Sequence, residues 1–410
     1  MSSRPAPTDP TVRALVSMVQ SGLTRRRMLG LGGGAAAAAL LAACAPPTPP
    51  AAGKTDVVLP KDLSATDKVI NWANWTAYLD VDDATKTHPT LEAFQKATGI
   101  TVNYSEDIDD NNTYFNKIAP QLREKQAIGR DLFVFTDWMA NRVLREGLAQ
   151  PLDLIQMPHA PNLLPSLREV SFDPGRRYSL PWQGGFGGIG YNKNKLGRDL
   201  KNVSDLWAPD LKGKVVVLSE FRDTAGLIMQ ANGVDISGSF TKAQVQTAFE
   251  EVSKHIADGS IRRVKGNSYL EDLKSGNAIA GIVWSGDLAT LKAETEDDSW
   301  TFVLPESGGT IWTDNMMIPI TSAHRSNTMK LMDYYYQPEV AAQVAAYVNY
   351  ICPVLGAQEE LAKTDATTAA NPFIFPTDTF LTEQKVQAFR ALTSDEDADY
   401  STLWSKVLGE

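Results

Sequence analysis

The sequence predicts an α/β fold built from two lobes. Segments typical of strands and helices alternate over residues 69–147, which is the pattern of a parallel sheet covered by helices. A second alternating stretch runs over residues 215–304. Extended segments near 182–190 and 310–317 follow these two stretches and are placed to cross between the lobes. The 410 residues and the 43% hydrophobic content are sufficient for two such lobes.

Apolar runs and helical spacing define the elements of the first lobe. Leu91, Phe94 and Ala97 share one face of a helix that ends at Gly99. A proline-spaced loop follows Pro151 and leads to an extended run and a run of glycines. The expected elements are strands over 69–75, 100–104 and 131–135, helices over 91–98 and 114–126, a short helix ending near Gly147, the extended run 178–182 and the glycine run 184–190.

In the second lobe, Thr241 and Gln244 form a capping box at the start of a helix. Met329 and Met332 follow helical spacing further along and are expected in the core. The apolar face of the capped helix consists of Val245, Ala248, Phe249, Val252 and Ile256. Other expected elements are strands over 215–218, 278–284 and 301–304 and helices near 324–337, near 339–347 and at the C-terminus. These elements divide the chain into a first part of lobe 1 (68–183), lobe 2 (184–311) and a return to lobe 1 with C-terminal helices (312–410). The assignment of residues 360–410 to either lobe is left open.

The N-terminus indicates export. Three arginines at 25–27 precede an apolar run over 29–43, which is too short to span a bilayer and ends in Leu41-Ala42-Ala43-Cys44. The arginines resemble a twin-arginine signal, and the last four residues resemble a lipobox, in which the cysteine is acylated. We therefore expect an export signal over 1–43, a lipid anchor at Cys44 and a flexible tether over 44–67, with the protein on the outer face of the cytoplasmic membrane or in the periplasm. The alternative is an ordinary anchor helix with an incidental cysteine.

Composition restricts the partners of the folded part. The net charge is −10, and residues 1–43 hold five basic residues and one acidic residue, so the remainder is more acidic still. This charge argues against nucleic acid and favours cationic ligands. With Cys44 acylated, Cys352 has no partner for a disulfide within the chain.

Motifs for catalysis, nucleotides or metals are weak. Residues 185–190 match G-x-G-x-x-G, but the following residues favour an extended segment or turn rather than the helix that a dinucleotide site needs. We interpret these glycines as positions where backbones approach closely. Residues 107–112 begin like a calcium loop but lack its glycine and its last glutamate, and we expect them to cap the next helix. The four histidines lack metal spacing, and the tyrosines 334–336 are read as packing rather than an iron site. We therefore expect no metal, no cofactor and no enzymatic activity.

Aromatic residues beside carboxylates are the strongest signal in the sequence. Trp312 and Asp314 lie two residues apart in an extended segment, so they share a face of the strand. An aromatic face beside a carboxylate suits an organic cation, although a core tryptophan and a turn aspartate are the alternative. Similar groups end three other predicted strands: Trp75 to Tyr78, Thr136 to Trp138, and Trp284 to Asp287.

These motifs resemble the spermidine/putrescine-binding proteins, the extracellular receptors of polyamine ATP-binding-cassette (ABC) importers. The resemblance runs from about 69 to 355, and Tyr350 matches a late tyrosine of that family. It is carried by Asn-Trp-Thr-x-Tyr (74–78), Asp-Leu-x-Val (131–134), Tyr-Ser-Leu-Pro (178–181), Ser-Asp-Leu-Trp (204–207), Trp-Ser-Gly-Asp (284–287) and Ile-Trp-x-Asp (311–314).

The resemblance implies a two-lobed periplasmic-binding-protein fold of type II, with the ligand in a cleft at the hinge between the lobes. It implies aromatic walls around a polyamine chain and carboxylates on its ammonium groups. It further implies a monomer that delivers the polyamine to an ABC permease. The implied ligand-binding residues are Trp75, Thr76, Tyr78, Thr136, Trp138, Glu220, Asp223, Trp284, Asp287, Trp312, Asp314 and Tyr350.

Two departures and several alternatives remain at this point. Ala77 stands where relatives carry an acid, and the bulk of Trp138 is expected to enlarge one wall and shorten the cavity. A site for another small organic cation, a sugar or a peptide is the first alternative, and a surface enzyme is the second.

Overall fold

The computed structural model describes residues 58–82 and 84–409. The predicted export signal (1–43), Cys44 and most of the predicted tether lie outside the described residues. From Asp62 onward the chain forms one compact unit. In the described part of the chain, every helix is too short or too polar to cross a membrane.

A mixed sheet of ten strands runs through this unit, which confirms the α/β prediction. The order along the sheet is β2-β1-β3-β11-β6-β9-β7-β8, with β10 paired to β6 and β12 paired to β11. Strands β1, β2 and β3 are parallel to one another, as are β7, β8 and β9. The bounds are β1 (Val69–Trp75), β2 (Thr101–Ile108), β3 (Leu132–Thr136), β6 (Ser179–Asn192), β7 (Val215–Leu218), β8 (Ile261–Lys265), β9 (Ala280–Trp284), β10 (Trp300–Val303), β11 (Thr310–Met317) and β12 (Gln387–Ala388). A separate pair is formed by β4 (Glu169–Val170) and β5 (Asp173–Pro174).

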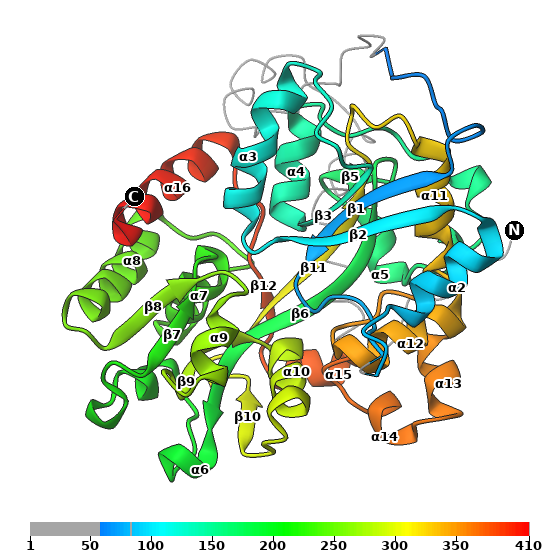
Figure 1. The fold of residues 1–410 in the computed structure, drawn as a ribbon. Helices are drawn as coiled ribbons and strands as arrows, with labels where there is room; N and C mark the ends of the chain where they lie inside the picture. The colour runs from blue at the N-terminus through cyan, green and yellow to red at the C-terminus, as the bar shows by residue number, and fades with distance from the viewer. Residues whose placement is uncertain (1–57, 83, 410) are drawn as a thin grey trace, which may run out of the picture. The chain divides into compact units, whose positions relative to one another are not determined.

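Two long strands connect the two parallel groups, as Figure 1 shows. Strand β11 runs antiparallel to both β3 and β6, and β6 runs antiparallel to β9. We call the group β1–β3 with its helices lobe 1 and the group β7–β9 with its helices lobe 2. The expected crossing segments near 182–190 and 310–317 are therefore confirmed as β6 and β11.

Helices follow the strands of each lobe. Those of lobe 1 agree with the predictions to within a few residues, and the capping box at Thr241 is present. Met329 and Met332 are buried, as expected. The helices are α2 (Pro89–Thr98), α3 (Asn111–Arg123), α4 (Asp137–Arg145), α5 (Pro165–Arg168), α6 (Lys193–Leu196), α7 (Phe221–Ala231), α8 (Lys242–Ala257), α9 (Tyr269–Lys274), α10 (Ser285–Thr295), α11 (Arg325–Tyr334), α12 (Pro338–Val348), α13 (Ala357–Ala362), α14 (Ala366–Ala369), α15 (Asp378–Glu383) and α16 (Ser394–Leu408).

Four helices and one strand in the segment predicted as lobe 2 were missed by the sequence analysis: α6, α7, α9, α10 and β8. Helix α7 begins only two residues after β7 ends, and its first turn carries the polar residues Arg222, Asp223 and Thr224, so the change from strand to helix was not recognised. Strand β8 reads Ile-Arg-Arg-Val-Lys and pairs only with β7, so it is an edge strand without an apolar run.

The C-terminal helix α16 packs on lobe 2. Its Trp404 ring lies 4.9 Å from the Phe249 ring of α8, and Trp404 Nε1 donates a hydrogen bond to Ser219 O at 2.6 Å. This gives a place to part of the segment 360–410 that the sequence analysis left open. The residue boundaries proposed for the lobes stay a prediction.

Candidate ligand-binding site

A cavity lies where the strands of both lobes end. The empty space between its walls is about 390 Å³, which includes space open to solvent. Carboxyl ends of parallel strands are where α/β proteins commonly place ligands. The lining residues are Trp75, Thr76, Tyr78, Asn111, Thr136, Glu220, Asp223, Asn267, Trp284, Asp287, Trp312, Asp314 and Tyr350.

Eleven of the twelve residues predicted to bind a ligand line this one cavity. Trp312 and Asp314 both face it, in agreement with their expected position on one face of a strand. Asn111 and Asn267 were not predicted; each precedes or begins a helix, and nothing in the local sequence marks them as cavity residues.

Trp138 does not line the cavity, so the expectation that its bulk shortens the cavity is wrong. Thr136 is the N-cap of α4, and Trp138 is the second residue of that helix, where the helical turn directs its side chain elsewhere. The Trp138 ring instead packs on arginines: the guanidinium carbon of Arg222 lies 3.8 Å from the ring centroid, and that of Arg142 lies at 5.3 Å.

Aromatic rings form most of the apolar wall. The Trp284 ring lies 6.1 Å from the rings of both Trp75 and Trp312, at interplanar angles of 83° and 72°. The Tyr350 ring lies 5.6 Å from Trp312 and 5.2 Å from Tyr78. These T-shaped and tilted contacts stabilise the rings against one another. They leave the indole N–H of Trp312 buried without a partner among the described residues.

Glycines of β6 and α10 make room for these rings. A Cβ atom at Gly185 would lie 2.6 Å from the Trp312 ring and 2.8 Å from the Tyr350 ring. A Cβ atom at Gly286 would lie 2.5 Å from the Tyr350 ring. The glycine run 184–190 lies within strand β6, as the interpretation of close approach predicted, and a strand continues where a dinucleotide site would need a helix.

Asp287 lies on one side of the cavity, and three side chains donate to it. Tyr350 Oη donates at 2.6 Å, Tyr269 Oη at 2.7 Å and Asn267 Nδ2 at 3.0 Å. Burial raises the pKa of Asp287 to about 6, although these hydrogen bonds oppose the rise. The carboxyl group is therefore held in place before any ligand arrives.

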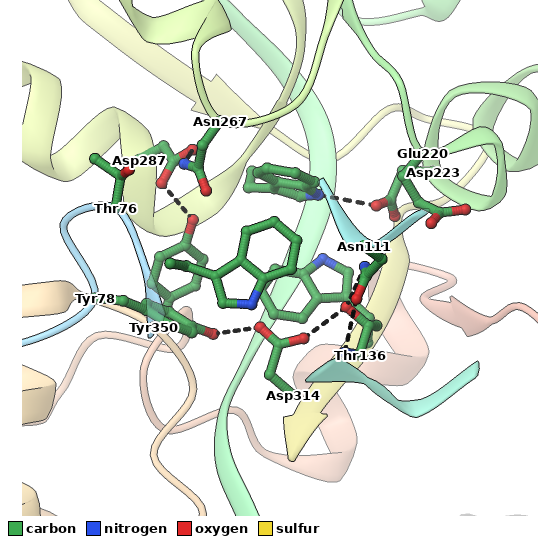
Figure 2. A pocket seen from close by; sticks show the side chains of 13 residues that line it. Thr76, Tyr78, Asn111, Thr136, Glu220, Asp223, Asn267, Asp287, Asp314 and Tyr350 are labelled. Carbon is green, nitrogen blue, oxygen red and sulfur yellow. Dashed lines mark hydrogen bonds between the residues drawn. The ribbon is translucent and has the colours of Figure 1, made fainter. Parts of the chain in front are cut away.

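Asp314 lies on another side, in strand β11 (Figure 2). Thr136 Oγ1 donates to it at 2.6 Å and Tyr78 Oη at 2.9 Å. Asn111 Nδ2 in turn donates to Thr136 Oγ1 at 2.9 Å, which fixes the hydroxyl. The pKa of Asp314 is raised to about 7. Burial is the main cause, and the charges of Asp137 and Asp223 act in the same direction, whereas the two hydrogen bonds act to lower the pKa.

Asp223 and Glu220 form a third acidic group, at the start of α7. Asp223 accepts hydrogen bonds from Trp284 Nε1 at 2.8 Å and Thr310 Oγ1 at 2.6 Å, and burial raises its pKa. Glu220 is the N-cap of α7 and already pairs with Arg222, whose Nη1 lies 3.1 Å from one carboxyl oxygen. Burial raises the pKa of Glu220 to about 7 despite this arginine.

The cavity therefore collects negative charge without matching positive charge. Four carboxyl groups line it, and Lys, Arg and His are absent from its lining among the described residues. Asp223, Asp287 and Asp314 have no ion-pair partner within the described part of the chain. Figure 2 shows the carboxyl groups at separate places around the aromatic rings. Such a cavity can hold a molecule with several positive charges joined by apolar segments.

The calcium-like segment 107–112 has structural contacts instead. Asp110 caps α3 by accepting from Thr113 N at 2.9 Å, as predicted. Asp109 accepts a hydrogen bond from Ser268 N at 2.6 Å. Across residues 58–82 and 84–409, no cluster of His, Cys, Asp and Glu side chains is arranged to hold a metal ion. Tyr336 belongs to the tyrosine run 334–336, for which packing was predicted rather than an iron site. It is buried and donates a hydrogen bond to Pro181 O at 2.6 Å.

The sheet order and the cavity between two α/β groups define the class of protein: a two-lobed binding protein of the periplasmic type II fold. The structure of the spermidine/putrescine ABC transporter substrate-binding protein of Streptococcus pneumoniae has this fold, with a TM-score of 0.64 and 24% identity over 84% of this chain and 99% of that one. A binding protein of A. tumefaciens in complex with agropinic acid also shares it, with a TM-score of 0.66 and 15% identity over 83% of this chain and 99% of that one.

Sequence comparison gives the family. A sequence model of the bacterial extracellular solute-binding proteins matches residues 89–375, and the chain belongs to this family. The chain is also 28% identical, over 319 residues, to the spermidine/putrescine-binding periplasmic protein of Escherichia coli K12. That alignment covers 76% of this chain and 85% of the relative.

Proposed function

We propose that this protein captures polyamines of the spermidine and putrescine class outside the cytoplasmic membrane and delivers them to an ABC importer. The observation that carries the proposal is the set of three buried carboxyl groups, at Asp223, Asp287 and Asp314, that have aromatic walls between them and no cationic partner among the described residues. A polyamine supplies ammonium groups for the carboxylates and methylenes for the rings. The similarity to polyamine-binding relatives supports the same ligand class.

Acidic ligands fit this cavity poorly. The fold alone accommodates them, as the agropinic acid complex illustrates. In the present cavity an acid would add a negative charge to four carboxyl groups without meeting a basic side chain. A neutral sugar could stack on the tryptophans but would leave the carboxylates unpaired, which costs free energy in a closed cavity.

The proposed ligand residues are the cavity residues of the sequence prediction. Asp287 and Asp314 are proposed to pair with ammonium groups, and Asp223 with a third ammonium group where the polyamine carries one. Glu220 contributes less because Arg222 already neutralises it. The tryptophans and Tyr350 are proposed to flank the carbon chain. Trp138 is removed from the set.

We also propose that Cys44 anchors the protein to the membrane and that it acts as a monomer. The lipobox-like residues 41–44 support the anchor. A tether over residues 44–67 would allow the lobes to reach a permease in the same membrane.

Calorimetric titration tests the ligand. Spermidine and putrescine are expected to bind, and maltose, a tripeptide and agropinic acid are expected not to bind. A free polyamine concentration of 100 times the dissociation constant should also raise the free energy of unfolding by about 2.7 kcal/mol. Binding of an uncharged sugar or an acid in preference to every polyamine would refute the proposal.

A further inference from the structure

Helix α16 makes a contact between the lobes that the proposed function does not use. The helix lies outside residues 89–375, the part matched by the family. Its packing belongs to lobe 2, through Trp404 against Phe249 of α8. Figure 1 shows α16 extending from α8 toward the helices of lobe 1. The contact is made by Asp397, in the first turn of α16.

One carboxyl group of Asp397 joins arginines from both lobes. Its Oδ2 atom accepts from Arg142 of α4, with Nη2 at 2.8 Å and Nε at 3.1 Å, and from Arg145 Nη2 at 3.3 Å. Its Oδ1 atom accepts from Arg222 Nη2 of α7 at 2.8 Å. The side chains of Asp397 and Arg222 are each only 8% exposed, and that of Arg142 is 17% exposed. The contact is therefore largely removed from water.

The arginines also hold Trp138 between them. The ring lies 3.8 Å from the guanidinium carbon of Arg222 and 5.3 Å from that of Arg142. Burial acts to raise the pKa of Asp397, but the charges of Arg222 and Arg142 outweigh it and keep the pKa below the ordinary value. Asp397 thus stays ionised, with three positive charges around it.

We propose that Asp397 is a latch that holds the two lobes closed and slows the escape of the ligand. With the carboxylate in place, α4 of lobe 1 and α7 of lobe 2 are attracted to one group. Without it, Arg142 and Arg145 of lobe 1 lose their ion-pair partner and Arg222 of lobe 2 keeps only Glu220, so the attraction that joins the lobes at this contact is lost. A ligand that binds the closed state then loses affinity in proportion to the closed population. The effect on ligand escape rests on the proposed function, whereas the effect on closure does not.

The test measures closure and ligand escape separately in the full chain. The two native cysteines do not interfere with labelling, because Cys44→Ser removes one of them and Cys352 is buried. Spin labels are attached to new cysteines at two exposed positions, Lys117→Cys on α3 and Lys254→Cys on α8. Pulsed electron paramagnetic resonance then reports the distance between the lobes, and stopped-flow displacement reports the dissociation rate of spermidine.

In Asp397→Asn we expect longer interlobe distances without ligand and spermidine dissociation about tenfold faster, which corresponds to about 1.4 kcal/mol. Arg142→Gln should act in the same direction, and it leaves the packing of α16 on α8 untouched, so it decides the test if Asp397→Asn does not fold. The matched control is Asp399→Asn on the same helix. Asp399 pairs with Lys242 of lobe 2 at 2.7 Å in an exposed position, so this change should leave both readouts within twofold of the wild type.

Wild-type distances and dissociation rates in both Asp397→Asn and Arg142→Gln would overturn the latch. If the unaltered protein does not bind spermidine, the proposed ligand is wrong. The distances measured without ligand then decide the latch alone.

Discussion

Replacing Asp314 by Asn removes one negative charge from the cavity while keeping the size of the side chain. The carboxylate accepts hydrogen bonds from Thr136 and Tyr78, at 2.6 and 2.9 Å. Both donors are hydroxyl groups, which can rotate to accept a hydrogen bond from the new amide. The substitution therefore changes the charge of the site more than its shape.

The size of the effect follows from the burial of the carboxyl group. A rise of the Asp314 pKa from 3.8 to about 7 means that its ionised form is destabilised by about 4 kcal/mol relative to an aspartate in water. A bound ammonium group offsets this destabilisation, and asparagine cannot make that interaction. We therefore expect polyamine affinity to fall by about 2–5 kcal/mol. The ligand-free protein should be as stable as the wild type or more stable at pH 8, because asparagine has no buried charge.

Calorimetric titration with spermidine and thermal melting without ligand, both at pH 8, measure the two effects. Asp298→Asn is the matched control, because Asp298 is an exposed aspartate outside the cavity lining. Unchanged affinity in Asp314→Asn would remove Asp314 from the binding site. A large loss of ligand-free stability with little change of affinity would indicate that Asp314 is a structural hydrogen-bonding residue instead.

Four further predictions concern the same cavity and the N-terminus. Spermidine affinity should rise between pH 5 and pH 8, because Asp287 and Asp314, with pKa values of about 6 and 7, must lose protons to pair with ammonium groups. Calorimetric titration in buffers of different ionisation enthalpy measures the protons released on binding. An affinity that does not change with pH would contradict the pairing of these two carboxylates with the ligand. Because both pKa values are raised in the folded state, their contribution to ligand-free stability is present below about pH 4 and is lost as the pH rises through about 6 to 7. Gly185→Ala should lower affinity by about 1–3 kcal/mol by displacing the Trp312 ring, and calorimetry that finds wild-type affinity would show that the ring has room to move. Mass spectrometry of the membrane fraction should find a diacylglyceryl group on Cys44; soluble protein that begins at Met1 would contradict the anchor.

Most of the fold could be predicted from local sequence. Strand β7 was found at its observed bounds, because four apolar residues stand between Lys214 and Ser219. Helix α8 was found from its capping box and apolar face. Helix α7 was not found, because only Ser219 and Glu220 separate it from β7 and no capping box or apolar spacing was recognised at its polar first turn.

Some residues of the site could be predicted from local sequence, and others could not. Trp312 and Asp314 could be placed together from strand geometry alone, since alternate residues share a face. Asn267 and Tyr269 could not be found, because they meet Asp287 only through the packing of α9 against α10. Trp138 was wrongly predicted to line the cavity, because the sequence analysis treated it as the end of a strand. Helix α4 already begins at Asp137, and the helical turn directs the Trp138 side chain away from the cavity.

The acids of the cavity differ in how the fold supports their charge, and this difference bears on ligand capture. Asp287 and Asp223 lie in the first turns of α10 and α7, where the partial positive charge of a helix N-terminus favours an ionised carboxylate. Asp314 lies in strand β11, where burial and the nearby charges of Asp137 and Asp223 raise its pKa to about 7 against two hydrogen bonds. Closing the empty cavity at neutral pH therefore requires either a proton on Asp314 or an unpaired buried charge, and both oppose closure. A polycation removes this cost at several positions at once, whereas a neutral ligand removes it at none, so the same carboxylates that oppose closure of the empty protein make closure selective for cations.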